Sequence, residues 1–193
     1  MQTINSAIQW WAKNRSDVVA LSLGGDSITY QQWSLWIDRI AAHLIGLGVK
    51  PGDRVNACGL TSMAYCTLAM GAMRAGAIIA PLNARYTKPE LQEIVEDHDP
   101  TIIFADADQH EKFVGCKAPV YEISSLNALR EGAPAQVAYE PAPDSCVLII
   151  STSGSTAKPK GVMFSHRSMS SYVLANAIED NALSEGGGVI VVA

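Results

Sequence analysis

The sequence lacks the features that mark several large protein classes. It contains no G-x-G-x-x-G, so the dinucleotide fingerprint of Rossmann domains is absent. Lysine and arginine form no cluster, and the net charge is −5, which argues against a nucleic-acid partner. The cysteines show no paired spacing, which favours reduced and mostly buried thiols in a cytoplasmic protein: Cys58, Cys66, Cys116 and Cys146.

No segment predicts secretion or insertion into a membrane. The start, Met1 to Asn5, is polar and does not form a signal peptide. The most apolar stretch, Thr67 to Leu82, contains Arg74 and two glycines and is too short to span a bilayer. With 193 residues and 48% hydrophobic content, the chain is long and apolar enough to bury a sizeable core. Its length predicts one domain or one and a half.

Predicted strands alternate with predicted helices along the chain. The apolar spacing and capping signals predict helices over 4–14, 29–45, 62–75, 87–98, 107–114 and 165–178. Short apolar runs predict strands over 18–23, 54–59, 77–80, 101–105, 120–123, 146–150 and 162–164. The stretch 133–145, rich in alanine and proline, predicts a surface connection. This order predicts an α/β fold in layers, with a largely parallel sheet flanked by helices.

The most informative segment is the loop from Ser151 to Gly161, which reads S-T-S-G-S-T-A-K-P-K-G between two apolar runs. In such a loop, backbone N–H groups and hydroxyls can approach a phosphate, and a lysine can neutralise its charge. A P-loop is excluded because Pro159 stands where the second glycine should be. We therefore predict a triphosphate-binding loop between two strands, where no helix dipole supplies the main anion contact.

Other interpretations of this loop explain less. A solvated linker accounts for the small polar residues but not for the apolar runs on both sides. Ser155 to Lys158 spells S-x-x-K, the nucleophile motif of serine–lysine acyl enzymes. Gly154 and Pro159 flank these residues and disfavour the helix that would place serine and lysine on one face.

Further residues could be functional, but structural roles explain them more simply. The four tryptophans fall at helical spacings typical of a core, and His166 beside Ser165 is expected in a helix cap, with a minor binding role left open. A metal site is conceivable in one acidic cluster, but its spacing matches no ligand pattern, and polar ends of a strand and a helix account for it: Asp97, His98, Asp99, Asp106, Asp108 and His110.

The loop resembles the signature T-S-G-[ST]-T-G-x-P-K-G of the AMP-forming acyl-CoA synthetases, which share a superfamily with luciferases and adenylation domains. Ala157 replaces the usual glycine. If that position needs positive φ, alanine is strained there by about 1 kcal/mol or more. The segments 47–55, 74–83 (as R-x-G-A-x-x-x-P-L-N) and 161–166 are also similar to this family, so the resemblance covers essentially the whole chain.

The resemblance implies an activity for the intact enzyme. A carboxylic acid would attack Mg²⁺-bound ATP to give an acyl-adenylate and pyrophosphate, and the thiol of coenzyme A would then take the acyl group, in fatty acid or aromatic acid metabolism. The resemblance assigns no catalytic residue and no metal ligand to this chain. It does imply nucleotide-binding roles for Thr152, Ser153, Gly154, Ser155, Thr156, Ala157 and Lys160.

In this family the acyl pocket, the adenine contacts and the catalytic lysine follow the phosphate loop. We therefore expect residues 1–193 to be the N-terminal part of an AMP-binding domain that is inactive alone. We also expect it to form a homo-oligomer through an uncovered apolar sheet face and an open strand edge at 189–192. The alternative is a stand-alone, non-catalytic module that binds a nucleotide or takes part in assembly.

Overall fold

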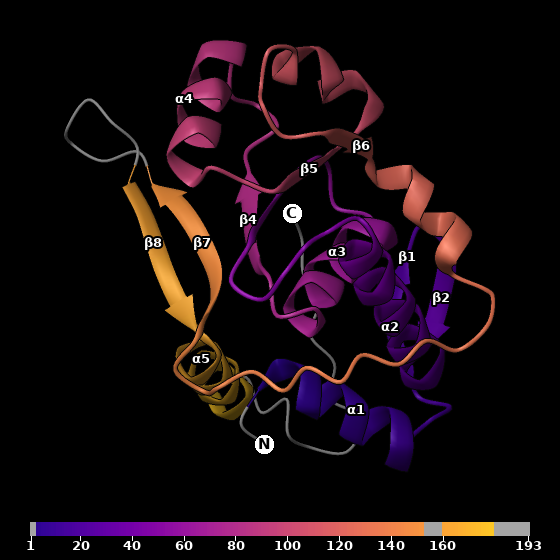
Figure 1. Ribbon diagram of the computed structural model, residues 1–193. Helices are drawn as coiled ribbons and strands as arrows, with labels where there is room; N and C mark the ends of the chain where they lie inside the picture. Colours follow the sequence, from indigo (N-terminus) through magenta and orange to yellow (C-terminus); the bar gives the residue numbers. More distant parts are fainter. Residues whose placement is uncertain (1–2, 153–159, 180–193) are drawn as a thin grey trace.

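A largely parallel sheet forms the centre of the computed structural model, which describes residues 3–152 and 160–179 (Figure 1). Its strand order is β6-β5-β3-β4-β7-β8. The first five strands are parallel to their neighbours, and β8 runs antiparallel to β7. The strands are β3 (Arg54–Cys58), β4 (Ile78–Leu82), β5 (Ile102–Ala105), β6 (Val120–Glu122), β7 (Cys146–Thr152) and β8 (Lys160–Ser165). A separate hairpin pairs β1 (Val19–Leu23) with β2 (Asp26–Thr29).

The helices begin where the capping signals predict. The Gln32 side chain accepts from the Thr29 N–H at 2.9 Å, and the Glu90 carboxylate accepts from the Thr87 N–H at 2.7 Å. The helices are α1 (Ile4–Asn14), α2 (Tyr30–Gly46), α3 (Met63–Arg74), α4 (Lys88–His98) and α5 (His166–Glu179). The predicted helix over 107–114 is the 3₁₀ helix η1 (Ala107–Phe113), and a second 3₁₀ helix, η2 (Ile123–Leu129), was not predicted.

Helices cover both faces of the sheet, which gives the predicted layers. Apolar residues of α2 and α3 pack on one face, against Val55, Ile79 and Phe104. On the other face, Leu91 and other apolar residues of α4 pack over β3, β4 and β5. Figure 1 shows α4 well away from α2 and α3. The stretch 133–145 has no helix or strand, as predicted for a connection.

The tryptophans are not all in the core. Trp33 and Trp36 are buried on α2, as predicted. Trp10 is 48% exposed, so its prediction as a core residue is wrong. Neighbouring residues on a helix point in different directions, and α1 buries only one side. Trp11 takes the more favourable place, stacked on Tyr30 with the ring centroids 5.2 Å apart.

The four cysteines are free thiols, of which Cys58 is buried and the others are half-buried. No helix in residues 3–152 and 160–179 combines the length and the apolar character needed to cross a membrane.

Gly76 closes the turn between α3 and β4, and it allows a sharp test of the packing there. Its φ is +81°, and an added Cβ would lie 2.6 Å from the Tyr139 ring. We expect Gly76→Ala to lower the free energy of unfolding by about 2 kcal/mol, measured by urea denaturation. Gly46→Ala is the control, since its Cβ would meet nothing within 4 Å. Equal stability of the two variants would contradict this packing.

Candidate phosphate-binding site

The predicted phosphate loop connects β7 to β8, which pair as an antiparallel hairpin. The last residue pair of the two strands is Thr152 opposite Lys160. The Thr152 hydroxyl donates to the Lys160 carbonyl at 3.3 Å and links the strands at the base of the loop. The structure therefore brings these two predicted site residues together and confirms that the loop lies between strands. The other predicted site residues lie outside the described part of the chain: Ser153, Gly154, Ser155, Thr156 and Ala157.

The hairpin projects from the edge of the sheet where the parallel strands end (Figure 1). In open α/β sheets, ligands bind outside the carboxyl ends of the strands. Thr152 and Lys160 are both exposed. Lys160 forms no ion pair with any residue of the described ranges. An exposed ammonium group beside an exposed hydroxyl can neutralise and hydrogen-bond a polyphosphate.

Gly161 lets the two strands approach closely just behind Lys160. A Cβ at Gly161 would lie 3.0 Å from the Ile149 Cγ2 atom, which is tighter than ordinary contact. The glycine after the lysine of the signature therefore has a packing reason in this fold.

A buried network of polar side chains lies behind the hairpin and was not predicted from the sequence. His98, the last residue of α4, is 3% exposed and points into the sheet. Its Nδ1 lies 2.9 Å from the Asn56 amide nitrogen, and its Nε2 lies 3.0 Å from the Ser151 hydroxyl. The amide nitrogen of Asn56 also donates to the Ala80 carbonyl at 3.0 Å. One imidazole thus joins β3, α4 and the end of β7.

The Asn56 amide fixes which nitrogen of His98 carries the proton. The Ala80 carbonyl can only accept, so the Asn56 atom facing it is the NH₂ group. The second hydrogen of that group donates to Nδ1, which is therefore unprotonated. The proton of the neutral ring is then on Nε2, which donates to Ser151.

Burial lowers the pKa of His98 and of His166 below the ordinary histidine value of 6.5. The unfolded chain therefore takes up protons first as the pH falls below 6.5. We expect the free energy of unfolding to fall there, by at most about 1.4 kcal/mol per pH unit for each histidine. Urea denaturation at pH 7.5, 6.5 and 5.5 measures this slope. His98→Gln should flatten it, and an unchanged slope in that variant would contradict the assignment.

His166 does not belong to the phosphate site. The predicted cap at Ser165 is confirmed, because its hydroxyl accepts from the Ser168 N–H at 3.2 Å. His166 itself is buried at the start of α5. The six residues of β8 separate it from the loop, a length of about 20 Å, so its closeness in sequence does not place it near the loop.

The acidic cluster does not form a metal site. In the described ranges, no group of histidine, cysteine and carboxylate side chains could hold a metal ion. Asp99 forms an ion pair with Arg54 at 3.4 Å. Asp106 accepts from the Leu60 N–H at 2.8 Å and makes no helix-capping bond. The prediction that His98 belongs to a polar end beside a strand is wrong, because His98 is buried.

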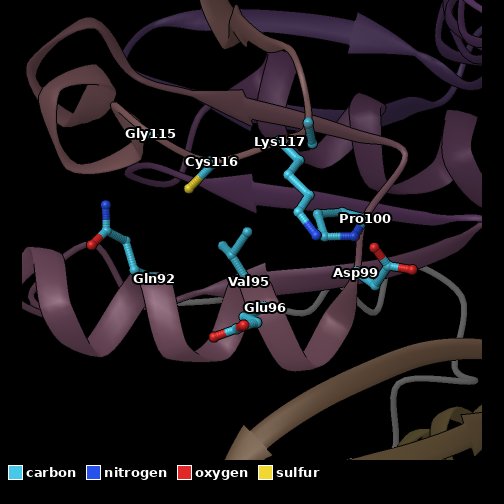
Figure 2. A pocket seen from close by; sticks show the side chains of 9 residues that line it. Gln92, Val95, Glu96, Asp99, Pro100, Gly115, Cys116 and Lys117 are labelled. Carbon is cyan, nitrogen blue, oxygen red and sulfur yellow. The ribbon is translucent and has the colours of Figure 1, made fainter.

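A hollow of about 310 Å³ lies between α4 and the segment 115–118 (Figure 2). Its walls carry charges of both signs, including Glu96 and Lys117, and no buried polar group that would orient a ligand is among its lining residues. Burial raises the pKa of the Cys116 thiol, which makes it a poor nucleophile. The hollow is therefore a weaker candidate for a functional site than the hairpin.

Comparison with known proteins decides the family. The family of AMP-binding enzymes matches residues 8–192. The chain belongs to this family. Its segment that resembles the family signature connects β7 to β8, at the carboxyl edge of a mostly parallel sheet.

Three AMP-binding relatives illustrate the range of the family. The fatty acid–[acyl-carrier-protein] ligase ScoC of Streptomyces coeruleorubidus is 31% identical, over 96% of this chain and 36% of its own length. The feruloyl-CoA synthase of Amycolatopsis is 29% identical, over 84% of this chain and 34% of its own. The fatty acyl-adenylate ligase of L. pneumophila, solved with acyl adenylate and pyrophosphate, has a TM-score of 0.77 and 26% identity, over 94% of this chain and 33% of its own. The chain spans about a third of each.

Proposed function

We propose that residues 1–193 are the N-terminal part of an enzyme that activates a carboxylic acid with ATP. The product of the first step is an acyl-adenylate, and pyrophosphate leaves. In the second step a thiol, that of coenzyme A, takes the acyl group and releases AMP. The observation that carries the proposal is the β7–β8 hairpin, which presents Thr152 and Lys160 at the base of a signature loop in a member of the AMP-binding family.

The chemistry at the base of the hairpin fits the phosphates of ATP. Lys160 brings one positive charge, and Thr152 brings one hydroxyl, at the exposed carboxyl edge of the sheet. Lys160 would contact the β- and γ-phosphates and hold the pyrophosphate as it leaves. Mg²⁺ bound to ATP would neutralise phosphate charge.

Relatives support the acid substrate and leave two kinds of thiol acceptor. The L. pneumophila ligase was solved with an acyl adenylate, which is the intermediate proposed here. Feruloyl-CoA synthase is named for a coenzyme A product, whereas ScoC is named for an acyl carrier protein. We propose coenzyme A as the acceptor, and the phosphopantetheine thiol of a carrier protein is the second candidate.

The experiment is an assay of the full-length protein with ATP, Mg²⁺ and a panel of fatty and aromatic acids. Mass spectrometry should detect an acyl-adenylate and, when coenzyme A is added, an acyl-CoA. If the acyl group of the adenylate is transferred only to a carrier protein, the acceptor is that protein and not coenzyme A. Binding of ATP without any acyl-adenylate would favour the non-catalytic module. The 193-residue chain alone should form no adenylate, because the hairpin offers no grip on adenine, ribose or the acid.

Exposed apolar side chains on β7 and β8 support association of the isolated chain. Ile150 and Val162 are each 42% exposed, and Met163 is 66% exposed, on a strand pair at the sheet edge. Such surfaces favour self-association. We expect a dimer or a larger species in sedimentation velocity, and a shift toward monomer in Met163→Lys. A wild-type chain that stays monomeric at about 100 μM, well above the Kd of a typical specific complex, would contradict this expectation.

A further inference from the structure

We propose that His98 is a positioning residue for the phosphate-binding hairpin: its neutral imidazole, protonated on Nε2, holds Ser151 and so fixes where Thr152 and Lys160 meet ATP. This inference rests on the proposed function for its last step only. The contact itself is a property of the fold, and it can be tested without any substrate.

The geometry makes His98 a fixed support. Asn56 is fully buried in the centre of the sheet, where it holds Nδ1, so the ring cannot turn without breaking a buried hydrogen bond. The other end of the ring donates to Ser151, which lies one residue before Thr152 on β7. Ser151 also faces Gly161 across the hairpin, next to the Lys160 pair. The support therefore acts directly behind the last residue pair of the hairpin.

The support matters because the end of β7 lies beyond the residue that pairs with β4. β7 joins β4 through the single residue pair Ile79 and Leu148, near its start. From Ile150 onward β7 is exposed or half-buried, with β8 as its sheet neighbour. Within the described ranges, the bond from His98 is the side-chain hydrogen bond that ties the end of β7 to the body of the domain.

Protonation of His98 would weaken this support, because Nε2 could still donate to Ser151 but the bond from Asn56 that holds the ring in place would be lost. A proton on Nδ1 would face the NH₂ group of Asn56, and rotation of that amide would set its oxygen against the Ala80 carbonyl. Burial is the main cause that opposes the protonated ring. Among the charges nearby, Asp97 of α4 favours the protonated ring, while Arg54 of β3, whose guanidinium donates to the His98 carbonyl, opposes it. β4 and β7 face the ring with the neutral groups already described. The hairpin should therefore loosen as the pH falls.

The first test is amide hydrogen exchange of the chain at pH 7.5. In Ser151→Ala and in His98→Leu, the amide hydrogens of residues 151–152 and 160–161 should exchange about fivefold faster than in wild type. This factor corresponds to the loss of one hydrogen bond. His98→Gln keeps a donor in reach of Ser151 and should stay within about twofold of wild type. Unchanged exchange in Ser151→Ala, which removes only the half-buried end of the network, would overturn the proposal even if His98→Leu does not fold.

The second test is ATP–pyrophosphate exchange by the full-length protein. Ser151→Ala should raise the KM for ATP about fivefold and leave kcat within about twofold. In wild type the KM for ATP should rise between pH 7.5 and 6 more than it does in His98→Gln. The control is His110→Gln, because the His110 ring contacts the Ala105 carbonyl and not the hairpin. Its KM should equal that of wild type.

The two tests separate the failure of this inference from failure of the proposed function. If amide exchange is faster in the variants but wild type shows no pyrophosphate exchange, then His98 does hold the hairpin and the proposed enzyme activity is wrong. If wild type is active and Ser151→Ala has the same KM for ATP, then the enzyme activity is confirmed and His98 is not a positioning residue.

Discussion

Replacing Lys160 with alanine is expected to lower ATP–pyrophosphate exchange by the full-length protein by about tenfold or more. Lys160 stands at the base of the signature loop, exposed and opposite Thr152, where its ammonium group can reach the phosphates of ATP. Loss of one charge-assisted contact to a polyphosphate has this scale. The loss should fall on kcat as well as on the KM for ATP, because charge on the leaving pyrophosphate grows in the transition state.

Lys158→Ala is the matched control for this prediction. It removes the same charge from the same loop, at a position that the family signature leaves variable. Its activity should stay within about twofold of wild type, since the signature assigns no phosphate contact to this position. Equal losses in the two variants would contradict a specific role for Lys160 and would indicate a general electrostatic effect.

Removing the Asp38 carboxylate should destabilise the fold by about 2–3 kcal/mol. Asp38 on α2 accepts from Arg74, the last residue of α3, at 2.5 Å, and Arg74 is 4% exposed. The Nε and Nη2 atoms of Arg74 have no hydrogen-bond partner in the described ranges, so Asp38→Ala would leave a buried guanidinium with little compensation. The Asp38 side chain is 20% exposed, so water would relieve part of the cost. Urea denaturation measures it.

Two comparisons make the prediction about Asp38 specific. The double variant Asp38→Leu with Arg74→Met removes both charges and should stay within about 1 kcal/mol of wild type. Asp144→Ala breaks the ion pair between Asp144, which is 75% exposed, and Arg167, which is 63% exposed, and should cost much less stability than Asp38→Ala. If the double variant is as unstable as Asp38→Ala, the loss comes from packing and not from an unpaired charge.

The sequence predicts those features of this fold that depend on local signals. The capping boxes at Thr29 and Thr87 place the starts of α2 and α4 correctly, because their hydrogen bonds join residues three positions apart. The two strands on either side of the loop are also predicted, since two apolar runs flank it directly; their antiparallel pairing is not. By contrast, η2 has no such signal, and the surroundings of Trp10 depend on which side of α1 meets α2.

The contacts of His98 could not be read from the sequence because they depend on residues far along the chain. Asn56 lies 42 residues before it, and Ser151 lies 53 residues after it. On α4 alone, His98 looks like a polar residue at a helix end, next to Asp97 and Asp99. A signal did exist: His98 follows Leu91, Ile94 and Val95 at helical spacing, on the side of α4 that packs on the sheet. The same long-range dependence hides the Asp38–Arg74 pair.

The central claim is that the β7–β8 hairpin binds the phosphates of ATP, and a titration of the ¹⁵N-labelled chain with MgATP, followed by NMR, tests it most directly. Binding should be weak, about millimolar, since association alone costs about 4 kcal/mol or more and the hairpin supplies few contacts. The amide shifts should be largest at Thr152, Lys160 and Gly161, pyrophosphate should reproduce them, and Lys160→Ala should abolish them. Shifts centred instead on α4 and Cys116, or shifts that persist in Lys160→Ala, would contradict the claim.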